Sequence, residues 1–116
     1  MHPSIFQKPG ENLYIAEEIK KHVKTPVVTV GAFSDPDLME QVIAEGKADL
    51  IAMGRALIAD PYLPTKVLHN QVEEITPCLR CHECMGSMMG TRTIRCTVNP
   101  IIGREVSEMR RLPAQT

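Results

Sequence analysis

The sequence predicts an α/β fold followed by an irregular segment rich in cysteine, and three observations support this prediction. Residues 27–30 and 48–54 are short apolar runs, and the strands that they predict end at Gly31 and Gly54. One stretch with helical periodicity separates them, so they form a strand–helix–strand unit with parallel strands and a right-handed crossover. From Thr76 onward periodic apolar residues become sparse, so burial alone cannot organise this part of the chain.

Helices are expected before, between and after the two strands. Apolar residues at near-helical spacing predict the first helix over about residues 11–23. The second spans about residues 36–45, because Asp35 can cap it, Pro36 fits its first position and Gly46 stops it. After the second strand, one helical turn over 55–59 and a further helix from 60 to about 69 are expected.

Both strands are expected to be covered on their two faces. The run at 27–30 is β-branched throughout, and Thr29 is its only polar residue. This composition is typical of a parallel strand with helices packed on either side. Aromatic residues make up only 3% of the chain, so the core must be built from smaller aliphatic side chains and is thin for independent stability.

Composition narrows the possible classes of protein. The chain has 116 residues, whereas a complete α/β barrel needs about 250. Its formal net charge is -1, from 13 basic and 14 acidic side chains, which favours neither nucleic acid nor an anionic membrane. Neither a long apolar run nor a signal-like start is present, so a cytoplasmic location is expected. In that reducing compartment, the cysteines are expected to be metal ligands or catalytic thiols rather than disulfides.

Two glycines and an arginine form a candidate phosphate site. Gly31 and Gly54 follow parallel strands, and ligands of α/β sheets collect at that edge. Glycine lets a phosphate approach the backbone, and Arg55 offers planar donors to its oxygens. The alternative is that both glycines only terminate strands and that Arg55 forms a surface ion pair.

The cysteines have the spacing C-x2-C-x2-C-x11-C. Three closely spaced thiolates can surround one side of a metal centre while a later one closes it, which favours an iron-sulfur cluster. A structural zinc site, with four thiolates or with His82, stays possible, as do redox thiols. The candidate ligands are Cys78, Cys81, Cys84 and Cys96.

Four segments in a fixed order carry a resemblance to a known family. They are PVVTVG at 26–31, ADLIAMGRALIADP at 48–61, Pro77-Cys78, and CTVNP at 96–100. The chain resembles the NADH:flavin oxidoreductase (old yellow enzyme) family over nearly its whole length. More narrowly it is similar to the iron-sulfur branch, which includes 2,4-dienoyl-CoA reductase, enoate reductases, bacterial bile-acid and steroid ene-reductases, and trimethylamine dehydrogenase. Two residues between the second and third cysteines match the trimethylamine dehydrogenase type rather than dienoyl-CoA reductases, which leaves the substrate open.

The resemblance implies a division of the chain into three parts. Residues 1–75 would be the last two βα units of a TIM (β/α)8 barrel, 76–108 an iron-sulfur segment, and 109–116 the start of a linker to an FAD/NAD(P)H domain. The 4Fe-4S cluster held by the four cysteines would pass electrons between FAD and FMN. No catalytic residue falls within the chain. The implied contacts to the FMN phosphate are Gly31, Ala32, Phe33, Gly54 and Arg55.

The implied parent enzyme uses NAD(P)H to reduce the activated C=C bond of a small molecule, such as an enoate, a dienoyl-CoA or a steroid enone. The family's first six βα units and its G-x-G-x-x-G fingerprint do not occur in the sequence. We therefore expect a truncated chain that is inactive and poorly stable alone. The alternatives are a small zinc-stabilised binding module and a partner subunit that completes a split barrel from another polypeptide.

Overall fold

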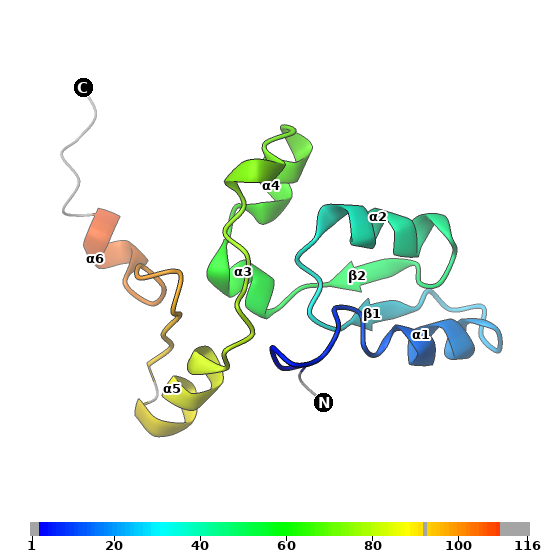
Figure 1. Ribbon diagram of the computed structural model, residues 1–116, viewed down its shortest axis with the longest axis horizontal. Coiled ribbons are helices and arrows are strands. Elements are labelled where there is room, and N and C mark those ends of the chain that lie inside the picture. The colour runs from blue at the N-terminus through cyan, green and yellow to red at the C-terminus, as the bar shows by residue number, and fades with distance from the viewer. Residues whose placement is uncertain (1–2, 92, 110–116) are drawn as a thin grey trace.

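The computed structural model describes residues 3–91 and 93–109, which form a small α/β unit followed by a tail of short helices (Figure 1). The tail leads away from the sheet. It includes residues 76–99, which are called the cysteine segment below. The elements in chain order are α1 (Leu13–Lys20), β1 (Val28–Val30), α2 (Pro36–Ala44), β2 (Leu50–Ala52), α3 (Arg55–Ala59), α4 (Leu63–Leu68), η1 (Val72–Glu74), α5 (Glu83–Thr91) and α6 (Glu105–Met109).

The two strands pair in parallel, as the strand–helix–strand pattern predicted. Val28 lies opposite Leu50 and Val30 opposite Ala52. In Figure 1, α1 lies next to β1 and α2 next to β2. The carboxyl ends of both strands therefore meet at one edge, from which α3 leads toward the cysteine segment.

A small core holds α2 against the sheet. Phe33, Val42 and Ala48 are buried together, and Leu13 and Ile51 pack against them. The cap of α2 is confirmed, because Asp35 Oδ1 accepts a hydrogen bond from the backbone N–H of Asp37 at 3.0 Å. Pro36 occupies the first helical turn as predicted.

The prediction that both faces of the strands are covered is wrong for this chain. Thr29 is only 3% exposed, whereas its neighbours Val28 and Val30 are 55% and 56% exposed. Alternate side chains of a strand point to opposite faces, so the helices cover the Thr29 face and leave the other open. Leu50 on β2 is exposed to the same extent as Val30.

Two helix predictions also differ from the structure. α1 is shorter than the expected helix over 11–23, because the backbone N–H of Lys21 turns to the Glu18 carbonyl in a tight final turn. The segment expected to be irregular contains the helix α5. At its start, the His82 carbonyl accepts hydrogen bonds from the N–H groups of Met85 and Gly86. Two glycines lower the helix propensity of α5, which is why periodicity did not reveal it.

None of the helices in the described part of the chain has both the length and the apolar composition that crossing a membrane requires.

Candidate functional site

A cavity of about 460 Å³ opens at the carboxyl ends of the two strands. All five residues of the predicted phosphate site line it. Pro3 and Asn12, which the sequence analysis did not select, line it as well, because the loop before α1 folds back over this edge. The predicted residues are Gly31, Ala32, Phe33, Gly54 and Arg55.

Arg55 begins α3 directly after Gly54 and carries an unsatisfied buried donor. Its Nη2 donates to the Pro3 carbonyl at 2.6 Å. Its Nη1 is buried and has no hydrogen-bond partner among the described residues. A buried guanidinium nitrogen without a partner is costly, so the arginine suits an anionic group that enters the cavity. The ion pairs among the described residues do not include Arg55, so they give no support to the alternative of a surface ion pair.

Gly31 and Gly54 differ in the space that is available for a β-carbon. The Gly31 carbonyl accepts the N–H of Gly10 at 2.7 Å, and a β-carbon at Gly31 would meet the Asn12 nitrogen at 3.6 Å, an ordinary contact. Among the described residues, a β-carbon at Gly54 would meet no atom within 4 Å. Gly54 therefore leaves free room beside Arg55, as a site for a close ligand would need.

Ala32 and Phe33 face the cavity in different ways. Ala32 has a φ of 57°, a left-handed conformation that is uncommon outside glycine and asparagine. Phe33 is only 2% exposed and is a member of the core. Little of Phe33 is therefore open to a bound group, although it belongs to the cavity lining.

All four predicted cysteine ligands line one narrow hollow beside the larger cavity. Cys84 is buried on α5, Cys81 is exposed, and Cys78 and Cys96 are half-buried. Among the described residues, no three His, Cys, Asp or Glu side chains are close enough together to hold a single metal ion. The thiols thus line one hollow without forming a single-ion site among the described residues.

The backbone of the cysteine loop is strained at two positions. Arg80 and His82 have φ values of 56° and 65°, in the left-handed region. The turn lets the N–H of Arg80 point at the Cys78 sulfur, at 3.4 Å. The Arg80 guanidinium donates to the Gln7 carbonyl, which ties the loop to the N-terminal segment.

The thiols differ in acidity because their surroundings differ. The Thr97 hydroxyl, 3.2 Å from the Cys81 sulfur, and the backbone N–H of Glu83 lower the pKa of Cys81. Burial raises the pKa of Cys84 and outweighs the nearby positive charge of Arg55. Cys81 is therefore the easier of these two thiols to ionise.

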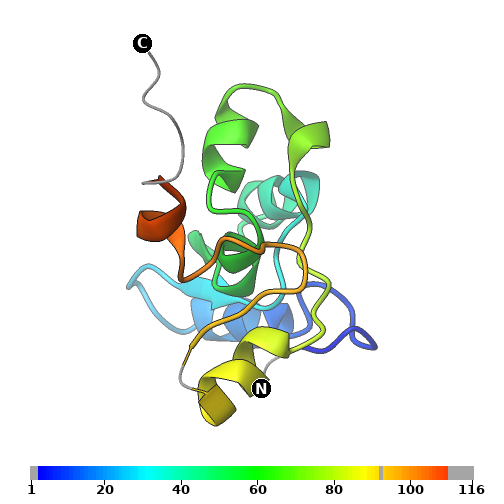
Figure 2. The ribbon, with the colours of Figure 1, turned by 90° about the vertical axis from the view of Figure 1, so that its left-hand side faces the viewer.

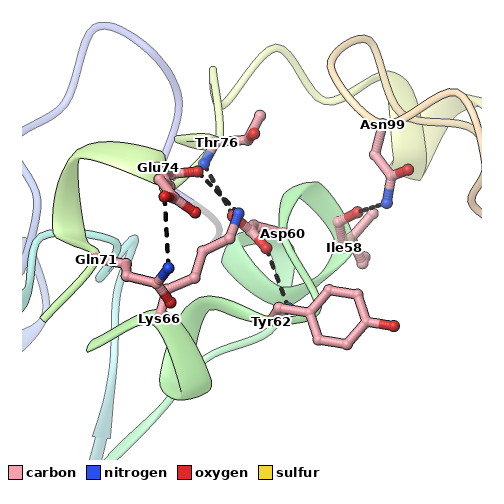
Figure 3. A network of polar contacts seen from close by, with 8 residues as sticks. All are labelled: Ile58, Asp60, Tyr62, Lys66, Gln71, Glu74, Thr76 and Asn99. Atoms are coloured by element: carbon pink, nitrogen blue, oxygen red, sulfur yellow. Dashed lines mark hydrogen bonds and ion pairs between the residues drawn. The ribbon is translucent and has the colours of Figure 1, made fainter. Parts of the chain in front are cut away.

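Polar contacts that the sequence analysis missed attach the cysteine segment to α3 and α4 (Figure 3). Asp60 accepts hydrogen bonds from the N–H groups of Tyr62 and Thr76 at 3.0 and 2.9 Å, and pairs with Lys66 Nζ at 2.6 Å. Asn99 Nδ2 donates to the Ile58 carbonyl at 2.8 Å. The only sequence signals were the Asp60-Pro61 pair, interpreted as a helix start, and the CTVNP segment.

The fold and the cavity define an α/β unit with an arginine at the cavity that opens at the carboxyl ends of its strands, and comparison with known proteins gives its family. Residues 2–74 match the model of the NADH:flavin oxidoreductase / NADH oxidase family. The chain belongs to this family, and its relatives place it in the iron-sulfur, old yellow enzyme branch that the sequence resembles.

Two curated relatives and one solved structure illustrate the match. The chain is 44% identical to an NADH oxidase of Thermoanaerobacter brockii, over 99% of this chain and 18% of the relative. It is 43% identical to a cinnamate reductase of Clostridium sporogenes, over 90% of this chain and 16% of the relative. A 6-hydroxypseudooxynicotine amine oxidase from Pseudomonas geniculata N1 matches with a TM-score of 0.85 and 39% identity, over 90% of this chain and 16% of that one. The chain thus spans less than a fifth of the length of these proteins.

Proposed function

We propose that this chain supplies the FMN phosphate site and the 4Fe-4S ligands of a larger flavin-dependent oxidoreductase. The observation that carries the proposal is the position of Arg55. Its unpartnered Nη1 is buried, and the residue lines both the strand-edge cavity and the cysteine hollow. Cys78 also lines both, so the two candidate sites share a wall.

The strand-edge cavity fits a phosphate. Arg55 Nη1 provides a charged donor, and the absence of a β-carbon at Gly54 leaves space for the approach. Gly31, Ala32 and Phe33 line the same cavity. In the larger protein, bound FMN would supply hydride and single-electron chemistry, while these residues hold its phosphate.

The spacing of the four cysteines supports a cluster rather than one ion. A zinc ion with Zn–S bonds of about 2.3 Å draws four sulfurs tightly together. Three cysteines within seven residues and a fourth further along the chain can instead surround a cluster with several irons, which is a larger body. The cysteine spacing therefore favours iron-sulfur over the zinc-stabilised binding module, which is the second candidate.

The division of the chain that we propose is the one that the family resemblance implies. Residues 1–75 would form the last two βα units of an FMN-binding TIM barrel, and 76–108 the cluster segment. A linker toward an FAD/NAD(P)H domain would occupy 109–116, of which 110–116 lie outside the described residues. The exposed faces of β1 and β2 support a barrel, because neighbouring strands and helices would cover Val28, Val30 and Leu50.

The reaction class that we propose is the NAD(P)H-driven reduction of an activated C=C bond in a small molecule, such as an enoate, a dienoyl-CoA or a steroid enone. The similarity to a cinnamate reductase supports this class. The isolated chain would be inactive, and the rest of the barrel and the FAD domain would lie elsewhere in the protein or on a partner subunit.

Metal and flavin analysis of the complete protein, purified without oxygen, tests the proposal. We expect a brown preparation that contains FMN, iron and acid-labile sulfide. A colourless preparation that contains zinc and no iron would instead establish the zinc-stabilised module.

A further inference from the structure

Helix α3 lies between the two candidate sites, and both ends of the cysteine segment are bonded at its carboxyl-terminal side. Arg55 at its start faces the strand-edge cavity. Ile58 and Asp60, one turn further on, accept hydrogen bonds from residues that flank the cysteines. Figure 2 shows the chain after α5 crossing α3.

The first attachment is the buried carboxylate of Asp60, which is only 4% exposed. It accepts the N–H of Thr76, two residues before Cys78. Lys66 balances its charge and also donates to the Glu74 carbonyl at 2.8 Å. The chain that enters the cysteine segment is therefore held at two adjacent points.

The second attachment is Asn99, three residues after Cys96. Its Nδ2 reaches the Ile58 carbonyl across 41 residues of sequence. Its Oδ1 accepts the N–H of Ile101 at 3.2 Å, which fixes the orientation of the amide. The far end of the segment is thereby held on the same helix.

Between these ends, the buried side chain of Ser87 connects α5 to the chain just before Cys96. The Ser87 hydroxyl donates to the Cys84 carbonyl at 3.2 Å and accepts the N–H of Arg95, next to Cys96, at 3.0 Å. The segment is therefore an internally linked loop whose two ends are both bonded to α3 or to the residue that follows it.

Building on the proposed function, we propose that Asp60 and Asn99 are positioning residues that fix Cys78 and Cys96 relative to Arg55, and so set where the cluster lies relative to the flavin. Neither side chain lines the cysteine hollow. Both act through backbone atoms, and together they make the thiols and the phosphate ligand parts of one rigid unit.

The test compares Asp60→Ala and Asn99→Asp with a matched control, Asp49→Ala, in the complete protein. Asn99→Asp replaces the donor to Ile58 by a charged carboxylate oxygen and keeps the acceptor for Ile101. Asp49 resembles Asp60 in pairing with a lysine, Lys20, and accepting a backbone N–H, that of Val27, but it joins α1 to β2 away from the cysteines. The measurements are FMN content, the rate of iron loss to a chelator, and the electron paramagnetic resonance spectrum of the reduced cluster.

We expect Asp60→Ala and Asn99→Asp to lose iron at least about tenfold faster than the wild type, as for residues that orient metal ligands. Their resonance spectra should change while FMN content stays the same. Asp49→Ala should match the wild type in both cluster measurements. The inference is overturned if both variants match Asp49→Ala in the rate of iron loss and in the resonance spectrum. If Asp60→Ala fails to fold, the result for Asn99→Asp decides.

A wild-type protein that contains no iron would overturn the proposed function and this inference with it. A wild-type protein with a full cluster and unaffected variants would overturn the inference alone. The two failures are therefore distinguishable in the same set of preparations.

Discussion

Arg55 Nη2 is hydrogen-bonded to the Pro3 carbonyl, 52 residues earlier in the chain. This bond holds the guanidinium across the strand-edge cavity and leaves Nη1 buried and without a partner among the described residues. The arginine is thus fixed in orientation before any ligand binds. A fixed donor spends little conformational entropy on binding, which makes Arg55 the residue on which FMN affinity should depend most.

Arg55→Ala should weaken FMN binding by about 1.5–3 kcal/mol, the range for hydrogen bonds to charged groups. Arg55→Lys should give an intermediate loss, because lysine keeps the charge but not the planar fork of donors. The measurement is titration of the flavin-free complete protein with FMN. An unchanged affinity in both variants would exclude Arg55 as the phosphate ligand.

Cys78→Ser and Cys96→Ser should each abolish the cluster while FMN stays bound. Serine is a poor replacement for a thiolate in iron-sulfur ligation, and neither cysteine belongs to the predicted phosphate ligands. Iron content and FMN content measure the two effects separately, and NAD(P)H-dependent reduction of FMN should fall with the iron. If these variants and Arg55→Ala lost both groups equally, the model of two separate sites would be wrong.

Asp60 should make stability depend on pH in the acidic range. Burial alone would raise the pKa of its carboxyl, but hydrogen bonds from Lys66, Thr76 and Tyr62 outweigh burial and hold the pKa below the usual value. A lowered folded-state pKa means that the carboxylate stabilises the fold above its unfolded value of about 3.9. That contribution is lost as the pH falls through the folded-state pKa.

The check is the difference in free energy of unfolding between the wild type and Asp60→Asn. It should be constant near neutral pH and should shrink as the pH falls below about 4. A difference that stays the same throughout this range would show that the ionised carboxylate contributes nothing.

The Arg80→Gly variant of the protein should be more stable than the Arg80→Ala variant. The φ of 56° at Arg80 is left-handed, which costs residues with a β-carbon about 1–2 kcal/mol. Arg80→Ala and Arg80→Gly both lose the contact to Gln7, so their difference isolates the backbone. At the exposed helical position Glu40 the order should reverse, with alanine about 1 kcal/mol more stable than glycine. Equal stabilities of the two Arg80 variants would indicate that the loop relaxes.

Local signals in the sequence were sufficient for the parts of the fold that depend on neighbouring residues. The cap at Asp35 and the turn at 55–59 were predictable because their determinants lie within a few positions. The bonds from Arg55 to Pro3 and from Asn99 to Ile58 depend on where distant segments meet, so no local pattern indicates them. The exposure of Val28 was missed because the composition of a strand indicates the environment in which it packs well. It does not indicate whether the same chain contains the elements that would cover it.

The last prediction concerns residues 1–116 expressed alone, which should associate and should not reduce an enone. Among the described residues, β1 and β2 pair only with each other, and Val28, Val30 and Leu50 leave an apolar face open. Unpaired strand edges beside such a face promote association. Sedimentation at increasing concentration, with iron, sulfide and FMN supplied, should show oligomers, and NAD(P)H-dependent enone reduction should be absent.

The double variant Val28→Thr and Val30→Thr should associate less at little cost in stability, because threonine suits a strand and both positions are exposed. A cooperatively folding, active monomer of the wild-type chain would contradict the proposal that this sequence works as part of a larger barrel.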